Sequence, residues 1–515
     1  MIIAQKNTLR YTLFMQKIFL DTRELDQKCR EVFSLSEEIM MENASSSMEL
    51  IIRKQLASCN KNNGILILCG PGNNGADGYA LARRLSGEFT VVCSSVLEPK
   101  SPLCILQKER AEKSDVIFID GKSLINKNDF FNSSIIIDCI FGSGFNRKLE
   151  EPLKKIINMA NTSSAYKISC DVPTGLNVYG NIENEELNTA FIADATVTMG
   201  ALKLSLFSDT AKDYTGKILV SNLGVSQKKF ESTLSTNIFS LDREDLILPV
   251  RQKQNTHKGK YGHAAIVSGE KRGASVIAGN SALNFGSGLV TLVYETKNEE
   301  TYSSSKDNIP YIYELMHSNS FPKNTSAIAL GMGLGKDENI QKKYIEYLRT
   351  HTEIPCVLDA DILYNKEIFS LLKIREENKS KTILTPHPKE FASLMENLNL
   401  GTCDSSYAAQ NRFILSNKFS EKFPNTVLIA KGACSIIAYQ NKFYICRNGS
   451  NALSKAGSGD VLAGITVSLL SQGFDALTSA VSAVLSHAIA SENYVKEHNN
   501  FSLTPFKLIE QIAKL

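Results

Sequence analysis

A glycine-rich stretch that also carries two amides and a carboxylate is the first part of the sequence suited to chemistry. Residues 70–78 read GPGNNGADG, and Gly70, Gly72 and Gly75 have the G-x-G-x-x-G spacing of a dinucleotide-binding turn. An apolar, strand-like run precedes the stretch and a helical pattern begins at Ala76, so backbone N–H groups at a helix N-terminus would face a phosphate. Two interpretations remain open, an ordinary NAD-binding turn and a plain strand-to-helix turn.

The residues that follow argue against a dehydrogenase and exclude a P-loop. A dehydrogenase needs an acidic residue about 20 positions later to hold the ribose, but the next strand-like run, residues 89–96, ends in serines. A P-loop needs Lys-Ser or Lys-Thr directly after the glycines, and the sequence has neither. Asn73, Asn74 and Asp77 instead offer oxygen ligands and hydrogen-bonding groups.

Two further strand-like runs end in aspartate followed by a glycine-containing turn. Asp138 lies in IIIDCIFGSGF, and Asp171 lies in SCDVPTGLN together with Thr174. Because ligands bind outside the carboxyl ends of the strands in an open parallel sheet, these residues and Asn74 are expected at one rim. Carboxylate, amide and hydroxyl oxygens suit a hard cation or a proton transfer. The alternative is that each aspartate only caps a helix.

The segment NALSKAGSGDVLAG, residues 451–464, carries the strongest signal in the second half of the chain. Gly457, Ser458 and Gly459 precede an apolar helical pattern, so backbone N–H groups at that helix N-terminus form an anion hole. Asp460 is at its mouth and is a candidate base. The alternative is a glycine-rich N-cap with an acid in the first turn.

The elements that must position these residues alternate between strands and helices along the whole chain, the pattern of a parallel, doubly wound α/β fold. A chain of 515 residues is too long for one core. The alternation breaks in the polar stretch 223–237, where we place a boundary. The sequence therefore predicts two α/β domains, residues 1–228 and 237–515, with an antiparallel strand near 442–450.

Composition limits the classes of function. The chain is 43% hydrophobic, 22% charged and carries a net charge of +3, which gives no electrostatic case for nucleic acid or a membrane. Its 11 cysteines include no C-x-x-C pair, so free thiols and a cytoplasmic location are expected. Residues 1–14 precede what looks like the real beginning at Met15, and we expect them to lie outside the folded domain.

The ordered motifs GPGNNGADG, IIIDCIFGSGF and SCDVPTGLN resemble the epimerase half of the NAD(P)H-hydrate repair family over about residues 15–225. The resemblance implies a Rossmann-like three-layer sandwich and a potassium ion held by Asn74, Asp138 and Thr174. It implies that Asp171 contacts the hydrated ring and transfers a proton. Ala76, Ser143 and Thr174 replace the family's Gly, Thr and Ser. The implied contacts to the hydrate are Asn73, Asn74, Gly75, Ala76, Asp77, Gly142, Ser143, Gly144, Phe145, Asn146, Arg147, Lys148 and Asp171.

Motifs of the second half arrive in the order of the dehydratase half of the same family, over about residues 250–515. They include HKGKYGHAAIVSG, LGMGLG, LDAD, LTPHPKE and AKGACSII. The resemblance implies a ribokinase-like α/β domain in which Asp460 is the acid or base. Cys434-Ser435 replaces a usual His-Thr, and GSGD replaces GTGD. The implied hydrate contacts are Ala274, Gly333, His387 and Asp460, and the implied ADP contacts are Lys431, Gly432, Ala433, Cys434, Ser435 and Gly459.

Together these resemblances imply a bifunctional repair enzyme. One half would interconvert the R and S forms of hydrated NADH or NADPH, and the other would dehydrate the S form with ADP and magnesium. Expected partners are NADHX or NADPHX and ADP, and we expect a homo-oligomer, a tetramer or larger. The alternative is a ribokinase-like small-molecule kinase fused to a non-catalytic Rossmann-like interaction module.

Overall fold

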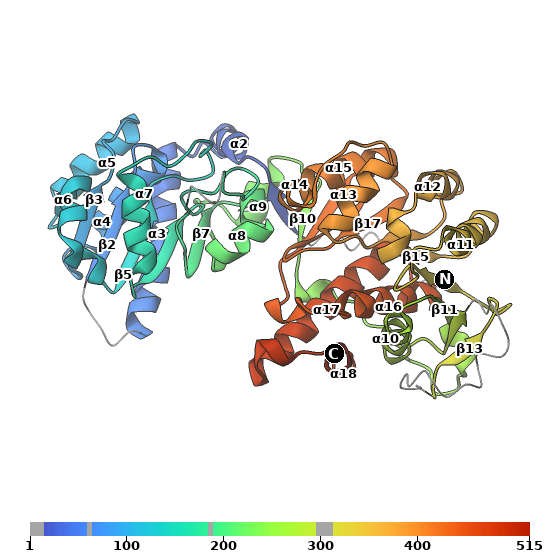
Figure 1. Ribbon diagram of the computed structural model, residues 1–515. Helices are drawn as coiled ribbons and strands as arrows, with labels where there is room; N and C mark the ends of the chain where they lie inside the picture. The colour runs from blue at the N-terminus through green and yellow to red at the C-terminus, as the bar shows by residue number, and fades with distance from the viewer. Residues whose placement is uncertain (1–14, 59–63, 184–188, 295–312) are drawn as a thin grey trace. The chain divides into compact units, whose positions relative to one another are not determined.

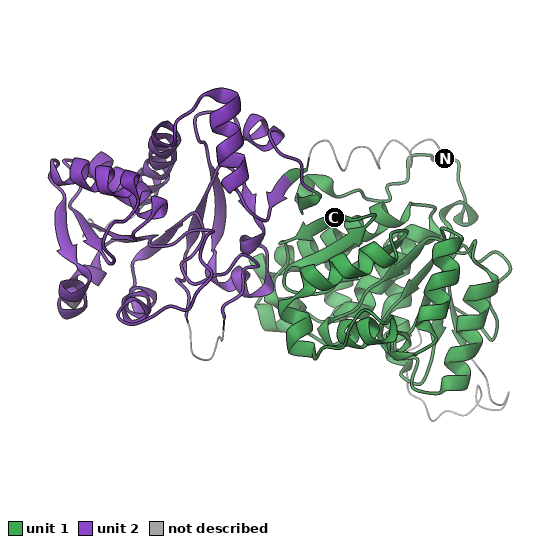
Figure 2. Ribbon diagram, turned by 90° about the horizontal axis from the view of Figure 1, so that it is seen from above, with its two compact units in different colours: residues 1–16, 237–515 green, residues 17–236 purple. Residues whose placement is uncertain are grey.

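The computed structural model describes residues 15–58, 64–183, 189–294 and 313–515. The expectation about residues 1–14 therefore concerns residues outside the described part. The chain forms two compact units, which are Lys17–Thr236 and Asn237–Leu515 together with the first 16 residues. Figure 2 colours the former, called here the N-terminal unit, purple and the latter, the C-terminal unit, green.

The N-terminal unit is built on an all-parallel seven-stranded sheet of order β4-β3-β2-β5-β6-β7-β9. Its strands are β2 (Ile65–Cys69), β3 (Val91–Ser95), β4 (Ile117–Asp120), β5 (Ile135–Cys139), β6 (Tyr166–Cys170), β7 (Ala195–Met199) and β9 (Lys217–Ser221). Alternate residues of β2 belong to hydrophobic clusters on opposite faces of the sheet. The apolar runs of the sequence are therefore strands buried on both faces.

Helices cover this sheet on both sides (Figure 1). They are α2 (Arg23–Phe33), α3 (Glu37–Ser58), α4 (Asn73–Leu85), α5 (Pro102–Glu112), α6 (Gly121–Asn126), α7 (Leu153–Thr162), α8 (Asp209–Tyr214) and α9 (Gln227–Ser232). Outside the seven-stranded sheet, a parallel pairing joins β1 (Gln16–Phe19) to β8 (Leu202–Lys203), with Phe19 in register with Lys203. This pairing links segments far apart in sequence, and it brings α2 to the site described below.

The C-terminal unit has a sheet of order β13-β12-β11-β14-β15-β16-β17-β18-β19-β10. The strands are β10 (Ile238–Leu241), β11 (His263–Ser268), β12 (Leu289–Tyr294), β13 (Met316–Ser318), β14 (Ala327–Leu330), β15 (Cys356–Leu358), β16 (Thr382–Leu384), β17 (Thr426–Ala430), β18 (Ser435–Tyr439) and β19 (Lys442–Cys446). Strands β13 to β17 are parallel, whereas β18 is antiparallel to both β17 and β19. The prediction of an antiparallel strand near residues 442–450 is confirmed.

The helices of this unit are α10 (Arg272–Asn284), α11 (Glu338–Thr350), α12 (Ile368–Glu377), α13 (Pro388–Asn397), α14 (Ser405–Gln410), α15 (Arg412–Lys422), α16 (Ser458–Ser471), α17 (Ala476–Glu497) and α18 (Pro505–Ile512). Helix α16 is buried along its whole length after the first turn, because apolar and small residues occupy all of its faces. Within the described residues, no helix has the length and apolar character required to cross a membrane.

Candidate active sites

The rim of the N-terminal sheet brings together the turns that follow β2, β5 and β6, which are neighbouring strands. Helix α4 begins at Asn73, three residues before the predicted helical pattern, so Asn73–Asp77 form its first turn rather than a loop. The glycines allow close backbone packing. A Cβ on Gly70 would lie 1.9 Å from the Ile140 carbonyl oxygen, and a Cβ on Gly75 would lie 2.0 Å from the Gly70 carbonyl oxygen.

Asp138 joins the turns after β5 and β6. Its carboxylate accepts hydrogen bonds from the Thr174 hydroxyl at 2.7 Å and the Thr174 amide at 2.8 Å. It also accepts from the Ile140 amide at 3.1 Å and the Ser169 hydroxyl at 3.3 Å. Burial raises the pKa of Asp138 to about 6, against the lowering effect of these bonds. Asp138 and Thr174, both predicted potassium ligands, are thus in direct contact.

Asn74, the third predicted ligand, has a buried amide group. Among the residues that the structure describes, neither its Oδ1 nor its Nδ2 has a hydrogen-bond partner. An unpartnered buried amide costs free energy. An amide oxygen, a carboxylate and a hydroxyl form an all-oxygen donor set that suits a hard cation.

Asp171 is in the left-handed region, with φ of 70°, and its side chain is fully engaged. Its two oxygens accept hydrogen bonds from the Ser143 amide at 2.9 Å and the Met199 amide at 3.3 Å. The Lys203 ammonium lies 2.6 Å from Oδ1. Burial raises the pKa of Asp171, but the Lys203 charge and these hydrogen bonds outweigh it and hold the pKa below its usual value.

Lys203 itself is almost completely buried, and sequence reasoning missed it. Its ammonium also donates to the Thr198 hydroxyl and the Met199 carbonyl, each at 3.0 Å. A lysine inside the apolar run ALKLSLF, residues 201–207, was the available signal, because a lysine is rarely fully buried unless it is paired.

Two more carboxyl groups share the electrostatic field of Lys203 and Asp171. Burial and then the charge of Asp171 raise the pKa of Asp77 well above its usual value, while Lys203 opposes the shift. On α2, burial raises the pKa of Asp26 to about 6, with Lys203 opposing the shift. Asp77 was among the predicted contacts, whereas Asp26 was not. The site therefore contains carboxyl groups whose pKa values are shifted in opposite directions, upward for Asp77 and downward for Asp171.

The predicted hydrate-binding segment 142–148 begins against this cluster and then turns to solvent. A Cβ on Gly142 would lie 2.6 Å from Asp171 Oδ2, so only glycine fits there. Phe145 is buried and stacks on Phe141 with ring centroids 5.0 Å apart. The remaining side chains of the segment are exposed or half-buried, and those of Asn146, Arg147 and Lys148 are exposed. Exposed cations beside a protein-bound acid–base pair suit a phosphate-bearing ligand.

The C-terminal site lies at the carboxyl ends of β14 to β17 and the first turn of α16. Lys431, which follows β17, lies 2.8 Å from Asp359 Oδ1 and 3.7 Å from Glu390 Oε2. Burial lowers the pKa of Lys431, but the charges of Asp359 and Glu390 outweigh it and raise the pKa. Lys431, the predicted nucleotide contact, is therefore protonated and lies between two acidic side chains.

Asp460 is in the first turn of α16, and Gly457 caps that helix with φ of 88°. Burial and then the charge of Asp359 raise the pKa of Asp460 to about 7, while Lys431 opposes the shift. A Cβ on Gly459 would lie 3.5 Å from the Lys431 ammonium, which places the two predicted contacts side by side. A carboxyl with a pKa near neutrality is suited to general base catalysis.

A half-buried histidine on α17, which sequence reasoning missed, contacts the same turn. His487 Nε2 lies 2.9 Å from the Ser458 carbonyl oxygen, so this nitrogen is the donor. Burial lowers the pKa of His487 to about 4, against the effect of that hydrogen bond, and the ring is neutral at physiological pH.

His387 is the N-cap of α13 and forms a capping box with Glu390. His387 Nδ1 accepts from the amides of Lys389 at 3.1 Å and Glu390 at 3.4 Å, and Nε2 lies 2.9 Å from Glu390 Oε1. Both ring nitrogens of His387 are therefore used within the protein, although its side chain is 45% exposed.

The other predicted hydrate contacts meet at the end of β14. A Cβ on Gly333, whose φ is 60°, would lie 3.1 Å from the Ala274 Cβ. The Gly335 amide donates to Asp361 Oδ2 at 2.9 Å, which ties this turn to the acidic segment after β15.

The residues of the predicted nucleotide-binding segment 431–435 differ in how far they are buried. Gly432 and Ala433 are exposed and Ser435 is half-buried, whereas the Cys434 side chain is completely buried. Arg412 Nη1 donates to the Ala430 and Cys434 carbonyls at 3.1 and 2.9 Å. Cys434 therefore offers a nucleotide its backbone and not its thiol. The assigned binding roles in both sites stay predictions.

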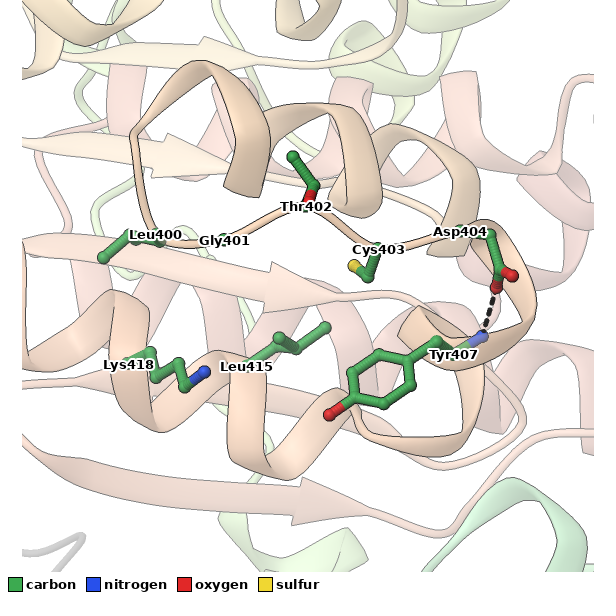
Figure 3. Close-up of a pocket in the computed structure, with 8 residues that line it drawn as sticks. All are labelled: Leu400, Gly401, Thr402, Cys403, Asp404, Tyr407, Leu415 and Lys418. Atoms are coloured by element: carbon green, nitrogen blue, oxygen red, sulfur yellow. Dashed lines mark hydrogen bonds between the residues drawn. The ribbon is translucent and has the colours of Figure 1, made fainter.

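Two other findings concern ligand sites. Across the described ranges, His, Cys, Asp and Glu side chains form no group of three or more that could hold a metal ion. A cavity of about 280 Å³ lies between the loop Leu400–Asp404 and α15 (Figure 3). None of the predicted site residues lines this cavity, which is bordered by Cys403, Tyr407 and Lys418.

Comparisons with known proteins cover both units. Residues 37–205 match the family model described as YjeF-related protein N-terminus, and residues 264–514 match that described as NAD(P)H-hydrate dehydratase. The chain is 40% identical over 504 residues to a bifunctional NAD(P)H-hydrate repair enzyme Nnr of Helicobacter pylori, covering 97% of this chain and 100% of that one. The counterpart from Dictyoglomus turgidum is 28% identical, with 95% and 96% covered.

Among solved structures, the chain is similar to the ADP/ATP-dependent NAD(P)H-hydrate dehydratase of Bacillus subtilis, co-crystallised with ATP and Mg²⁺. The TM-score is 0.42 at 23% identity, covering 51% of this chain and 92% of that one. The two family models and the full-length similarity to the Helicobacter pylori enzyme agree on one conclusion. The chain belongs to the family of bifunctional NAD(P)H-hydrate repair enzymes.

Proposed function

We propose that the N-terminal unit interconverts the R and S forms of hydrated NADH and NADPH, and that the C-terminal unit dehydrates the S form with ADP. The observation that carries the proposal is a shared arrangement. Each unit has a lysine–aspartate pair at the carboxyl edge of its sheet, the buried Lys203–Asp171 in one and the partly buried Lys431–Asp359 in the other. Beside each pair is another carboxyl whose pKa is raised, Asp77 or Asp460.

In the N-terminal unit these groups suit an exchange of the hydroxyl at C6 of the ring. Asp77 gives a proton to the departing hydroxyl, and the ring N1 lone pair assists cleavage of the C6–O bond. Water then adds to the other face of C6 and loses a proton to Asp171. One proton enters and one leaves, so the hydrate is regenerated with inverted configuration. Lys203 keeps Asp171 ionised for the second step.

Asn74, Asp138 and Thr174 would hold a potassium ion at the start of α4. The support is the unpartnered buried amide of Asn74 beside the Asp138–Thr174 pair. When bound there, the ion supplies positive charge to the phosphate-binding end of the site.

Replacement of Asn74 by alanine tests this assignment. Since the Asn74 amide has no hydrogen bond within the described residues, its removal should leave the melting temperature unchanged or slightly higher. The potassium concentration for half-maximal epimerisation should rise about tenfold. Epimerisation measured across a potassium series gives the answer, with sodium as the control salt. An unchanged potassium response would exclude Asn74 as a ligand.

In the C-terminal unit the chemistry starts with the C6 hydroxyl as a nucleophile. Asp460 takes its proton while the terminal phosphoryl group of ADP is transferred to the oxygen, leaving AMP. The ring N1 lone pair then expels phosphate, and C5 loses a proton to water, which restores the C5–C6 double bond. The N–H groups of the first turn of α16 face the transferred phosphoryl group. Magnesium would arrive with the nucleotide and offset its charge.

This role predicts the pH dependence of dehydration. Asp460 must be ionised to accept a proton, and its pKa is about 7. The single-turnover rate at saturating substrate should therefore increase with pH and level off above an inflection near pH 7. A rate that falls as pH rises through 7 would mean that Asp460 acts from its protonated form.

One assay tests the whole proposal. Purified protein is incubated with separated R or S NADHX, with and without ADP and magnesium, and absorbance of the dihydronicotinamide is followed. Both epimers should be restored only when ADP is present, and without ADP each should convert to the R/S mixture. Nucleotide consumption without a dihydronicotinamide product would support the kinase alternative.

The cellular and quaternary expectations complete the proposal. We propose a homo-oligomer of four or more subunits acting in the cytoplasm. The cysteines of the described residues are all free thiols, most of them buried, as in a protein of a reducing compartment. Sedimentation analysis measures the oligomeric state.

A further inference from the structure

Glu390 connects two parts of the C-terminal site that the sequence assigns to different ligands. It is the third residue of α13, directly after the TPHP turn, and its side chain is 6% exposed. A carboxylate so far from water requires charged or hydrogen-bonding partners to remain ionised. Burial raises the pKa of Glu390, but the hydrogen bond from His387 and the charge of Lys431 outweigh it and hold the pKa below its usual value.

The partners of Glu390 exceed what a capping box needs. In a capping box, the side chain of the third helical residue accepts from the N-cap amide, as Glu390 Oε2 does from His387 at 2.9 Å. The same oxygen lies 3.7 Å from the Lys431 ammonium. The other oxygen, Oε1, lies 2.9 Å from His387 Nε2. One carboxylate therefore contacts both the His387 ring and the Lys431 ammonium.

Lys431 couples Glu390 to Asp460 electrostatically. The ammonium lies between Asp359 and Glu390 and next to Gly459, the neighbour of Asp460. The charged groups that act on Asp460 are Asp359 and Asp361 after β15, Glu390 on α13 and Lys431 after β17. From α17, the neutral imidazole of His487 reaches the first turn of α16. Lys431 is the one cation in this set, and Glu390 is one of the two anions in contact with it.

We propose that Glu390 is a positioning residue of the C-terminal site, whose carboxylate holds Lys431 and His387 together and sets the pH at which Asp460 acts as a base. The inference rests on the proposed dehydration. It adds that one buried carboxylate holds both the turn predicted to contact the hydrate and the lysine predicted to contact the nucleotide.

The test is the pH profile of E390Q. Glutamine keeps the size of the side chain and removes its charge. Loss of a neighbouring anion favours ionisation of Asp460, and Lys431, with one anion fewer beside it, favours ionisation further. The inflection of the dehydration rate should therefore move down by about one pH unit. The rate above the inflection should fall about tenfold, because Lys431 and His387 lose their shared anchor.

Two further variants separate charge from structure. E390D keeps the charge on a shorter side chain, so it should lose rate above the inflection while its inflection stays near that of the wild type. E376Q is the matched control. Glu376 accepts hydrogen bonds from Asn425 and Thr426 at the opposite end of β17, so its loss should affect stability without moving the inflection.

The outcomes are distinct. If the wild-type protein does not dehydrate S NADHX, the proposed function fails. If it does and E390Q keeps the wild-type inflection, Glu390 only caps α13 and the inference is wrong. If E390Q does not fold, E390D decides. E390D keeps the negative charge, so an inflection displaced by about one pH unit in this variant would contradict a role based on charge.

Discussion

Replacement of Asp460 by asparagine should reduce the dehydration of S NADHX by about a thousandfold, the size of effect expected for a lost general base. Asparagine has nearly the same shape and stays in the first turn of α16, but it cannot accept the hydroxyl proton. Burial raises the pKa of the Asp460 carboxyl to about 7, so its ionisation disfavours the folded state above pH 3.8, and a neutral asparagine should leave stability at neutral pH unchanged or higher. The measurement is the rate of dihydronicotinamide formation with ADP, compared with the melting temperature.

The N-terminal unit supplies the internal control for this variant. Asp460 belongs to the unit Asn237–Leu515, whereas Asp171 and Lys203 belong to Lys17–Thr236. D460N should therefore interconvert the R and S hydrates at the wild-type rate. Retention of more than a few per cent of wild-type dehydration would remove Asp460 from the role of base, and loss of epimerisation would show that the two activities are not separable.

The sequence predicted the parts of the N-terminal site that follow consecutive strands. Asp138 and Thr174 follow apolar runs, and the parallel order of a doubly wound sheet was enough to place them at one rim. The first turn of α4 was not predicted as helix, because Asn73 and Asn74 are weak helix formers and the apolar periodicity starts only at Ala76. Gly72 in extended backbone lets the helix begin earlier.

Lys203 and Asp26 could not be placed from the sequence because their positions depend on a long-range pairing. Strand β1 joins β8, and Phe19 pairs with Lys203 across more than 180 residues. Sequence periodicity describes neighbours along one chain segment and contains no register between distant ones. Only the structure shows that α2 contributes a carboxyl to this site.

In the C-terminal site, the order of the motifs predicted which segments meet but not which side chains contact one another. The segments LDAD and LTPHPKE were recognised, yet Asp359 and Glu390 had no role until Lys431 was found between them. The contact of His387 with the hydrate stays a prediction; in the structure its Nδ1 accepts within the capping box and its Nε2 contacts Glu390 Oε1. Cys434 is buried because β18 begins at the next residue, and its carbonyl meets Arg412. Side-chain direction of this kind follows from packing rather than from residue type.

Replacement of Lys203 by methionine should abolish epimerisation and leave dehydration of the S form intact. Methionine fills a similar volume, but Asp171 becomes a buried carboxylate without its cation. Breaking such a pair costs about 3 to 5 kcal/mol of stability, and the pKa of Asp171 should rise so that it no longer accepts a proton at neutral pH. Chromatographic separation of the R and S hydrates without ADP measures the loss, which should be about a thousandfold.

The double variant K203M/D171N distinguishes lost chemistry from lost folding. With both charges of the buried pair removed, most of the lost stability should return, because no unpaired ion remains in the interior. Epimerisation should still be absent. If the double variant recovers epimerisation along with its stability, neither Lys203 nor Asp171 takes part in the chemistry, and the pair acts only on the fold.

Mixing two single variants gives the final test of the division of labour. D460N keeps only the epimerase and K203M keeps only the dehydratase. Neither variant alone should repair an R and S mixture completely. D460N should leave both forms unrepaired, and K203M should leave the R form unrepaired. Because the released S hydrate can diffuse from one protein to the other, the mixture with ADP should restore both epimers completely. Failure of the mixture, while each variant retains its own activity, would mean that the hydrate passes between the sites of one assembly without release.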